Sequence, residues 1–202
     1  MSSIVGHALA GITVASAFEH DEAKENRRKL FGLAALLSIT PDLDVLIYIA
    51  YRPLGMTPHR GFTHTIVFAL IAGGFMAIVC RRFLGLTYLR VFLIVSTVLL
   101  SHSLLDYLMG CGPGVPFFWP ISEQGFLLPF RLVPTAYYSL SVGDLLSVAV
   151  SPVTLVGMLL EIVIFLPLIL LSQRRSGASR LRLATISAFG IVLTLLIYNR
   201  LL

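Results

Sequence analysis

The chain has 202 residues, of which 57% are hydrophobic and only 12% are charged, and its mean hydropathy is +0.91. These values lie outside the range of soluble domains and predict an integral membrane protein. The net charge of +5 is compatible with nucleic-acid binding, but the positions of the basic residues give it another explanation.

Six apolar stretches predict membrane helices. A helix needs about 20 apolar residues to cross a hydrocarbon core about 30 Å thick, and only the first stretch is clearly shorter. Because lipid cannot satisfy free backbone groups, and the stretches lack strand-type alternation, we expect helices and not barrel strands. In chain order the predicted helices are Ile4–Phe18, Leu30–Tyr51, Phe62–Cys80, Leu89–Met109, Val153–Leu171 and Leu181–Leu202. The expected fold is an all-α polytopic membrane helix bundle of about five to six helices, in a single integral membrane domain spanning 1–202.

The basic residues are concentrated on one side of this predicted topology. Eleven of the fifteen flank the first, third and fifth connections between helices: Lys24, Arg27, Arg28, Lys29, Arg81, Arg82, Arg90, Arg174, Arg175, Arg180 and Arg182. By the positive-inside rule these connections face the cytoplasm, and both termini and the other two connections face away from it. The positive charge therefore orients the protein in the membrane, and we expect no nucleic-acid partner.

Titratable residues inside the predicted helices are candidates for a functional site, because such residues are costly in a membrane and usually face a bundle interior or a wet cavity. The first is His7, in the opening turns of the first helix. A buried histidine with satisfied hydrogen bonds is an equally good interpretation of this position taken alone.

The second predicted helix contains Pro41, which should kink it beside Asp42 and Asp44. Two residues that are two positions apart diverge by about 200° on a regular helix. We therefore expect one of these carboxylates to bind a metal ion while the other orients a histidine. Capping of a new helical turn by Asp42 is the alternative.

The segment "PHRGFTH" at 58–64 connects the second and third predicted helices. Gly61 permits a tight turn, and Thr63 is placed to cap the third helix. This arrangement would put His59 in the connection and His64 in the first helical turn. In the fourth predicted helix, "SHSLLD" places His102 and Asp106 four residues apart on one face, where they could bind one cation or simply hydrogen-bond to each other.

A segment rich in Pro and Gly, 110–140, follows the fourth helix and cannot form a continuous helix. We predict an interfacial loop whose aromatic side chains form a membrane-interface belt or line a lipid cleft; they are Phe117, Phe118, Trp119, Phe126, Tyr137 and Tyr138. Additional helices are expected over 141–202. Glu161 lies in the middle of one of them, where it could pair with an arginine or accept a proton.

The predicted topology brings the candidate residues to one depth, near the non-cytoplasmic face. They are His7, Asp42, Asp44, His59, His64, His102 and Asp106. A mixture of imidazoles and carboxylates favours Zn²⁺, with Mn²⁺ or Fe as alternatives, over the all-oxygen ligands that Ca²⁺ and Mg²⁺ prefer.

These motifs resemble those of the YdjM-like family of bacterial inner-membrane proteins, which are described as membrane-bound metal-dependent hydrolases. The resemblance covers about the first two thirds of the chain, within 1–120, and rests on "GHALAG" (6–11), "PDLD" (41–44), "HRGFTH" (59–64), "SHSLLD" (101–106) and "GVPFFWP" (114–120). It implies a multi-pass protein of the bacterial inner membrane whose His and Asp motifs bind metal.

The order of these residues is also similar to the first part of the ligand series of zinc-dependent phospholipase C. The later His and His-x3-Glu elements of that enzyme have no counterpart, because no histidine follows His102. One or two metal ions are therefore more plausible here than three.

The leading hypothesis is a membrane-embedded metal-dependent hydrolase that acts on a phospholipid or a lipid-linked phosphoester. We assign metal binding to His7, Asp44, His59, His64, His102 and Asp106. Asp42 would be the general base, although Asp42 and Asp44 could exchange roles, and Arg60 would hold the phosphate or simply sit at the membrane interface. Two other classes fit the same residues: an ion- or metal-handling transporter without hydrolysis, and a structural membrane protein with a His-Asp network.

Overall fold

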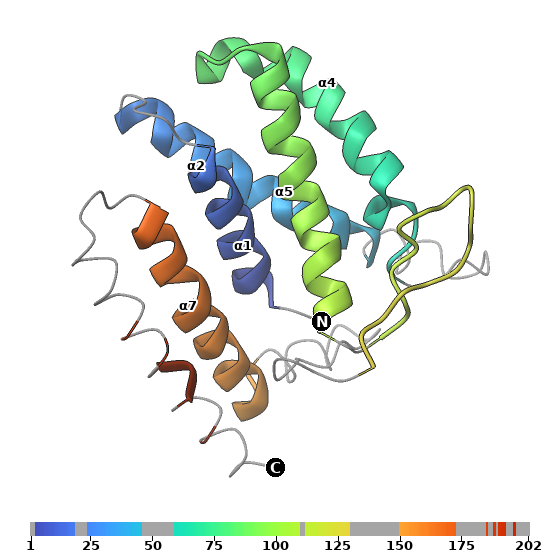
Figure 1. Ribbon diagram of the computed structural model, residues 1–202, viewed down its shortest axis with the longest axis vertical. Helices are drawn as coiled ribbons and strands as arrows, with labels where there is room; N and C mark the ends of the chain where they lie inside the picture. The colour runs from blue at the N-terminus through green and yellow to red at the C-terminus, as the bar shows by residue number, and fades with distance from the viewer. Residues whose placement is uncertain are drawn as a thin grey trace.

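The computed structural model describes residues 3–18, 24–45, 59–109, 112–129 and 150–172, together with 185, 188, 190–192 and 196. Within these residues the regular structure is helical, apart from an isolated β-bridge between Val115 and Phe126. In chain order the elements in Figure 1 are α1 (Ile4–Ala17), α2 (Lys24–Ile39), the 3-10 turn η1 (Thr40–Leu43), the 3-10 turn η3 (Phe62–His64), α4 (Ile66–Leu84), α5 (Tyr88–Leu108) and α7 (Pro152–Ser172). The prediction of an all-α fold is confirmed.

Among the described helices, three are long and apolar enough to cross a membrane: α4, α5 and α7. They contain 19, 21 and 21 residues, which corresponds to about 29 to 32 Å at 1.5 Å per residue. α1 is a shorter apolar helix of 14 residues. The predicted first, fourth and fifth helices agree with α1, α5 and α7 to within one residue at each end. Most of the predicted helix Leu181–Leu202 lies outside the described residues, and it stays a prediction.

The second predicted helix, Leu30–Tyr51, differs at its start and is interrupted at η1, and the predicted end over 46–51 lies outside the described residues. α2 begins earlier and includes an i,i+4 ion pair of 2.7 Å between Lys29 and Glu25. It ends just before η1, where Pro41 provides no backbone N–H for the α-helical hydrogen-bond pattern. Helical residues resume at Asp44 and Val45, so the chain changes its helical geometry at Pro41, and η1 with its C-cap carries Asp42 and Asp44.

The third predicted helix begins later than Phe62, and Thr63 is not its cap. Phe62 opens η3, and α4 follows with Thr65 as its N-cap in an extended conformation. The Thr65 hydroxyl oxygen accepts a hydrogen bond of 3.0 Å from the backbone N–H of Phe68, the standard way to satisfy a free N–H in the first turn. The Thr63 hydroxyl instead donates to the carbonyl oxygen of Pro41 at 3.1 Å, which joins η3 to η1.

Small residues allow α4 and α5 to pack closely. Ala69, Gly73 and Ala77 are buried and follow one another at four-residue intervals on α4. A Cβ atom added to Gly73 would lie 2.1 Å from the Oγ of Ser96 in α5. Stripes of small residues are a common means of helix association in membranes, where close backbone packing replaces the hydrophobic effect.

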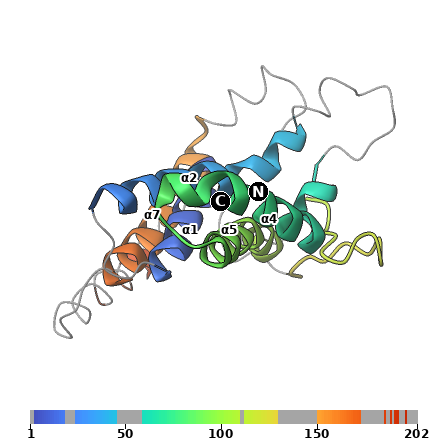
Figure 2. The same cartoon turned by 90° about the horizontal axis from the view of Figure 1, so that it is seen from above.

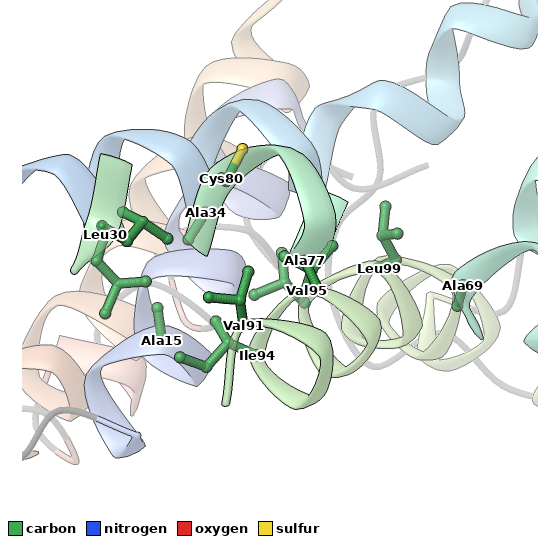
Figure 3. Close-up of a cluster of buried hydrophobic side chains, with 12 residues drawn as sticks. Ala15, Leu30, Ala34, Ala69, Ala77, Cys80, Val91, Ile94, Val95 and Leu99 are labelled. Atoms are coloured by element: carbon green, nitrogen blue, oxygen red, sulfur yellow. The ribbon is translucent and has the colours of Figure 1, made fainter. Parts of the chain in front are cut away.

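The main hydrophobic cluster fills the part of the bundle where α1 and α4 end and α2 and α5 begin. Figure 3 shows side chains from these four helices meeting there, and the labelled ones are Ala15, Leu30, Ala34, Ala69, Ala77, Cys80, Val91, Ile94, Val95 and Leu99. The apolar packing therefore leaves the opposite end of the four helices for polar side chains.

α1 lies between α7 and α5, as Figure 1 and the view from above in Figure 2 both show. Ala10 of α1, Leu105 of α5 and Met109 form a buried cluster that packs against Phe165 of α7. The helix that carries His7 therefore packs against both α5 and α7.

The described part of the Pro- and Gly-rich segment, 112–129, is not helical, as predicted. It folds back on itself through the bridge between Val115 and Phe126, and Phe117 accepts a hydrogen bond of 3.1 Å from the N–H of Ile66 at the start of α4. This loop therefore packs against the end of the bundle where α4 begins. Tyr137 and Tyr138 lie outside the described residues, and the interfacial placement of the loop stays a prediction.

The closest approach of α1 and α2 generates a prediction about stability. A Cβ atom on Gly11 would lie 2.6 Å from the Cβ of Ser38 and 2.7 Å from the carbonyl oxygen of Ala34. We expect Gly11→Ala to destabilise the protein by about 1–3 kcal/mol through overpacking, measured as a lower melting temperature in detergent.

Gly32 of α2 is the matched control, because a Cβ there would meet no atom within 4 Å. Gly32→Ala should leave the melting temperature unchanged or raise it, since Ala is a better helix former than Gly by about 1 kcal/mol. Equal melting temperatures for the two variants would contradict the close packing of α1 on α2.

Candidate metal centre

Four segments bring polar side chains together at one end of the bundle: the start of α1, η1, the segment 59–65 and the last two turns of α5 (Figure 1). All eight site residues named from the sequence lie in this cluster: His7, Asp42, Asp44, His59, Arg60, His64, His102 and Asp106. Two groups offer ligand atoms that lie within 4.8 Å of one another: His7, Asp42, His102 and Asp106, and Asp42, His59, His64 and Asp106.

His7 and His102 come from α1 and α5 and are both fully buried. Their rings stack with centroids 3.8 Å apart. The Nδ1 atom of His102 lies 2.6 Å from the backbone carbonyl oxygen of Ser38. Because that oxygen can only accept, Nδ1 carries the proton and the Nε2 lone pair of His102 faces the cluster.

The Nε2 atom of His102 faces the Nε2 atom of His64. It lies 3.1 Å from the Nε2 of His64 and 3.3 Å from the Oδ1 of Asp42. Two imidazole nitrogens at this distance repel each other unless a proton or a cation lies between them. This contact is therefore typical of either a hydrogen bond in which the Nε2 of His64 donates to that of His102, or two ligands of a metal ion.

Asp44 contacts His59 and His64 at their Nδ1 atoms, on the side of each ring that faces away from Asp42 and Asp106. Its Oδ1 accepts a hydrogen bond of 2.9 Å from the Nδ1 of His59, and its Oδ2 accepts one of 3.0 Å from the backbone N–H of Arg60. The same Oδ2 is 3.4 Å from the Nδ1 of His64. Asp44 thus fixes the outer nitrogens of two histidines, so that their Nε2 atoms face Asp42 and Asp106.

Arg60 is buried beside Asp106. Its Nε donates to the Oδ2 of Asp106 at 2.8 Å, and its Nη1 donates to the carbonyl oxygen of Pro113 at 2.7 Å. Its backbone φ of 62° is in the left-handed region, which is unfavourable for a residue with a side chain. The surrounding contacts maintain this conformation, and they connect the guanidinium to both α5 and the loop 112–129.

The charge and the hydrogen bonding of the cluster both suit a cation. Three carboxylates and one guanidinium give the described cluster a formal charge of −2 when the histidines are neutral. Within the described part of the chain, both ring nitrogens of His7 and the Oδ1 atoms of Asp42 and Asp106 are buried without a hydrogen-bond partner. Buried polar atoms and excess charge are costly unless compensated, and a divalent cation would compensate both.

Glu161, which has no local motif, binds the start of α1. It is 2% exposed in α7, and its Oε1 accepts a hydrogen bond of 3.0 Å from the backbone N–H of Ser3, while its Oε2 accepts one from the Ser3 hydroxyl. Ser3 is also the N-cap of α1. A carboxylate at a helix N-terminus is favourable, and this one fixes α1 one turn before His7.

Sequence reasoning overlooked Ser38, which links two of the candidate ligands. Its carbonyl accepts from His102, and its hydroxyl donates to the backbone carbonyl of His7 at 2.5 Å. A signal for it was available, because Leu30, Ala34 and Ser38 are spaced by four residues and form the buried face of α2. A serine on that buried face needs a hydrogen-bond partner, either in its own helix or in a neighbouring one.

The chain has relatives among known membrane proteins. The model of the family described as YdjM inner membrane protein matches residues 1–199. The inner membrane protein YbcI of Escherichia coli (strain K12) is 35% identical over 116 residues, which make up 56% of this chain and 66% of that protein. The match therefore spans just under two thirds of that relative's length. No solved structure matches the chain.

The contact between Glu161 and Ser3 generates a prediction. Glu161→Gln replaces one accepting oxygen with an amide group that cannot accept, so one of the two hydrogen bonds to Ser3 is lost. The expected destabilisation is about 1–3 kcal/mol, seen as a lower melting temperature in detergent. Glu25→Gln is the matched control, because the Glu25 side chain is 78% exposed and should tolerate the change. Equal melting temperatures would show that Glu161 does not hold α1.

Proposed function

This chain belongs to the YdjM inner membrane protein family, and from that premise we propose that it is a metal-dependent hydrolase of a phospholipid or another lipid-linked phosphoester. The observation that carries the proposal is the inward orientation of the histidines. The Nε2 atoms of His59, His64 and His102 face the carboxylates, while the Nδ1 atoms of these three are engaged by Asp44, Thr63 or Ser38. Such outer contacts are typical of metal-bound histidines.

The proposed ligands are the residues whose atoms form the two groups: His7, Asp42, His59, His64, His102 and Asp106. A bound divalent cation would lower the pKa of a water molecule and polarise a phosphoryl oxygen. Zn²⁺ is the first choice for this donor set, with Mn²⁺ and Fe as alternatives.

The proposed roles of Asp42 and Asp44 differ from the assignment made from the sequence, in which Asp44 is a ligand and Asp42 the general base. Asp42 belongs to both groups of candidate ligands, whereas Asp44 binds His59 and the backbone of Arg60 from behind. We therefore propose that Asp42 is a ligand and that Asp44 is a positioning residue. Arg60 would orient Asp106 and add positive charge that attracts a phosphate group.

An amphiphilic substrate is supported by the surroundings of the cluster. The loop 112–129, whose Pro113 binds Arg60, exposes large apolar side chains, with Phe118 51%, Trp119 38% and Ile121 91% exposed. Apolar and aromatic side chains of this kind partition into the membrane interface. A lipid could keep its chains in the bilayer while its headgroup reaches the metal centre, which we expect at the non-cytoplasmic face from the distribution of basic residues.

The proposal predicts metal-dependent turnover. Detergent-purified protein loaded with Zn²⁺ or Mn²⁺ should release a phosphorylated headgroup or phosphate from synthetic phospholipids in mixed micelles. Activity should disappear with a chelator and return with metal, and His102→Ala should lower kcat/KM at least about 100-fold. His20→Ala is the control, because the sequence places His20 in the charged connection "EHDEAKENRRK" (19–29), apart from the motifs that carry the proposed ligands.

Two results would contradict hydrolysis. Metal-loaded protein that turns over none of the tested phosphoesters but carries the ion into proteoliposomes would be a transporter. Folded protein that binds no divalent metal would use the His-Asp network for stability alone.

The roles of Asp42 and Asp44 can be separated by metal affinity, measured by competition with a chelator. Asp42→Asn should remove tight binding, because Asp42 contributes to both groups of ligands. Asp44→Asn should retain the metal with an affinity about 10–100-fold lower, because it weakens only the support of His59 and His64. The opposite ranking of the two variants would favour Asp44 as the ligand and Asp42 as the general base.

A further inference from the structure

Asp42 and Asp106 each direct their two oxygens toward different histidines. On one side, the Oδ2 of Asp42 lies 3.8 Å and the Oδ1 of Asp106 lies 3.6 Å from the Nε2 of His7. On the other side, the Oδ1 of Asp42 lies 3.6 Å and the Oδ2 of Asp106 lies 3.8 Å from the Nε2 of His59. Each carboxylate therefore has one oxygen on each side.

His64 and His102 complete the two sides. The Nε2 of His64 is 3.7 Å from the Oδ1 of Asp42 and 3.6 Å from the Oδ2 of Asp106, the same two oxygens that face His59. The ring of His102 stacks on that of His7, and both histidines belong to one group of possible ligands. The Nε2 of His102 also lies 3.3 Å from the Oδ1 of Asp42 and 3.1 Å from the Nε2 of His64. The cluster thus contains two sets of histidines that meet at His64 and His102, and the two carboxylates contact both sets.

The distances are those expected between ligands of a common ion. Two atoms bound tetrahedrally at about 2.1 Å from one metal ion lie about 3.4 Å apart. The contacts between histidine nitrogens and carboxylate oxygens on both sides are 3.6 to 3.8 Å, and that between His102 and Asp42 is 3.3 Å. A single ion bound beside His59 and His64 would leave the nitrogens of His7 and the Oδ1 of Asp106, all buried without hydrogen-bond partners in the described chain, uncompensated.

We propose that the centre holds two divalent ions bridged by Asp42 and Asp106. One ion is also bound by His7 and His102, and the other by His59 and His64. This inference rests on the proposed function, since it specifies the metal centre of that hydrolase.

A centre with two bound ions would favour a negatively charged substrate. The described cluster has a formal charge of −2 with neutral histidines, so one divalent ion would neutralise it and two would make it positive. A positive buried centre requires an anionic ligand to balance it. A phosphate ester supplies that charge, and paired ions about 3.5–4 Å apart are a common arrangement for phosphoryl chemistry.

The test is the number of ions per chain. Detergent-purified wild-type protein is loaded with Mn²⁺, freed of excess ion, and analysed for metal and protein content. We expect about two ions per chain and an electron paramagnetic resonance spectrum of a magnetically coupled Mn²⁺ pair. His7→Ala and His59→Ala should each retain about one ion, with an uncoupled spectrum, and His20→Ala should match the wild type.

The outcomes separate this inference from the proposed function. One uncoupled ion per wild-type chain would overturn the inference and leave a mononuclear hydrolase standing. No bound ion in folded wild-type protein would overturn both. Two ions retained in both His7→Ala and His59→Ala would overturn the assignment of these histidines as ligands. In the expected result, the one ion that each variant still binds also shows that the variant is folded.

Discussion

Two carboxylates, Asp42 and Asp106, must remain stable inside an apolar membrane bundle, and the polar structure around them serves that requirement. Asp106 is fully buried, and the side chain of Asp42 is only 13% exposed. An isolated carboxylate in such a place is destabilised by several kcal/mol. The protein surrounds the pair with four imidazoles and one guanidinium, and the formal charge stays negative. A divalent cation would compensate this charge.

The rest of the fold fixes these groups in position. Asp44 and Ser38 hold the outer nitrogens of His59 and His102, while Glu161 fixes the start of α1. The small residues of α1 and α4 let the helices approach closely enough for side chains from four segments to meet. The hydrophobic cluster fills the other part of these helices (Figure 3). Rigid support of this kind is what a metal centre needs to keep its ligands within a few tenths of an ångström.

The sequence predicted the helices and the meeting of the polar residues because both depend on simple regularities. Apolar length defines α5 and α7, and the i,i+4 spacing puts His102 and Asp106 on one face. Finer details depend on tertiary contacts. Thr63 and Thr65 can both cap a helix, and the hydrogen bond from Thr63 to η1 decides between them. No local pattern connects Glu161 with a partner 158 residues away.

The central claim is that imidazoles and carboxylates from four separate segments bind metal in one buried centre. X-ray absorption spectroscopy of the metal-loaded protein tests it most directly, because it reports the atoms around the ion without a substrate. We expect nitrogen and oxygen ligands at about 2.0–2.2 Å, together with the outer scattering of several imidazole rings. A shell of oxygen atoms without imidazole scattering, or one with sulfur ligands, would contradict it.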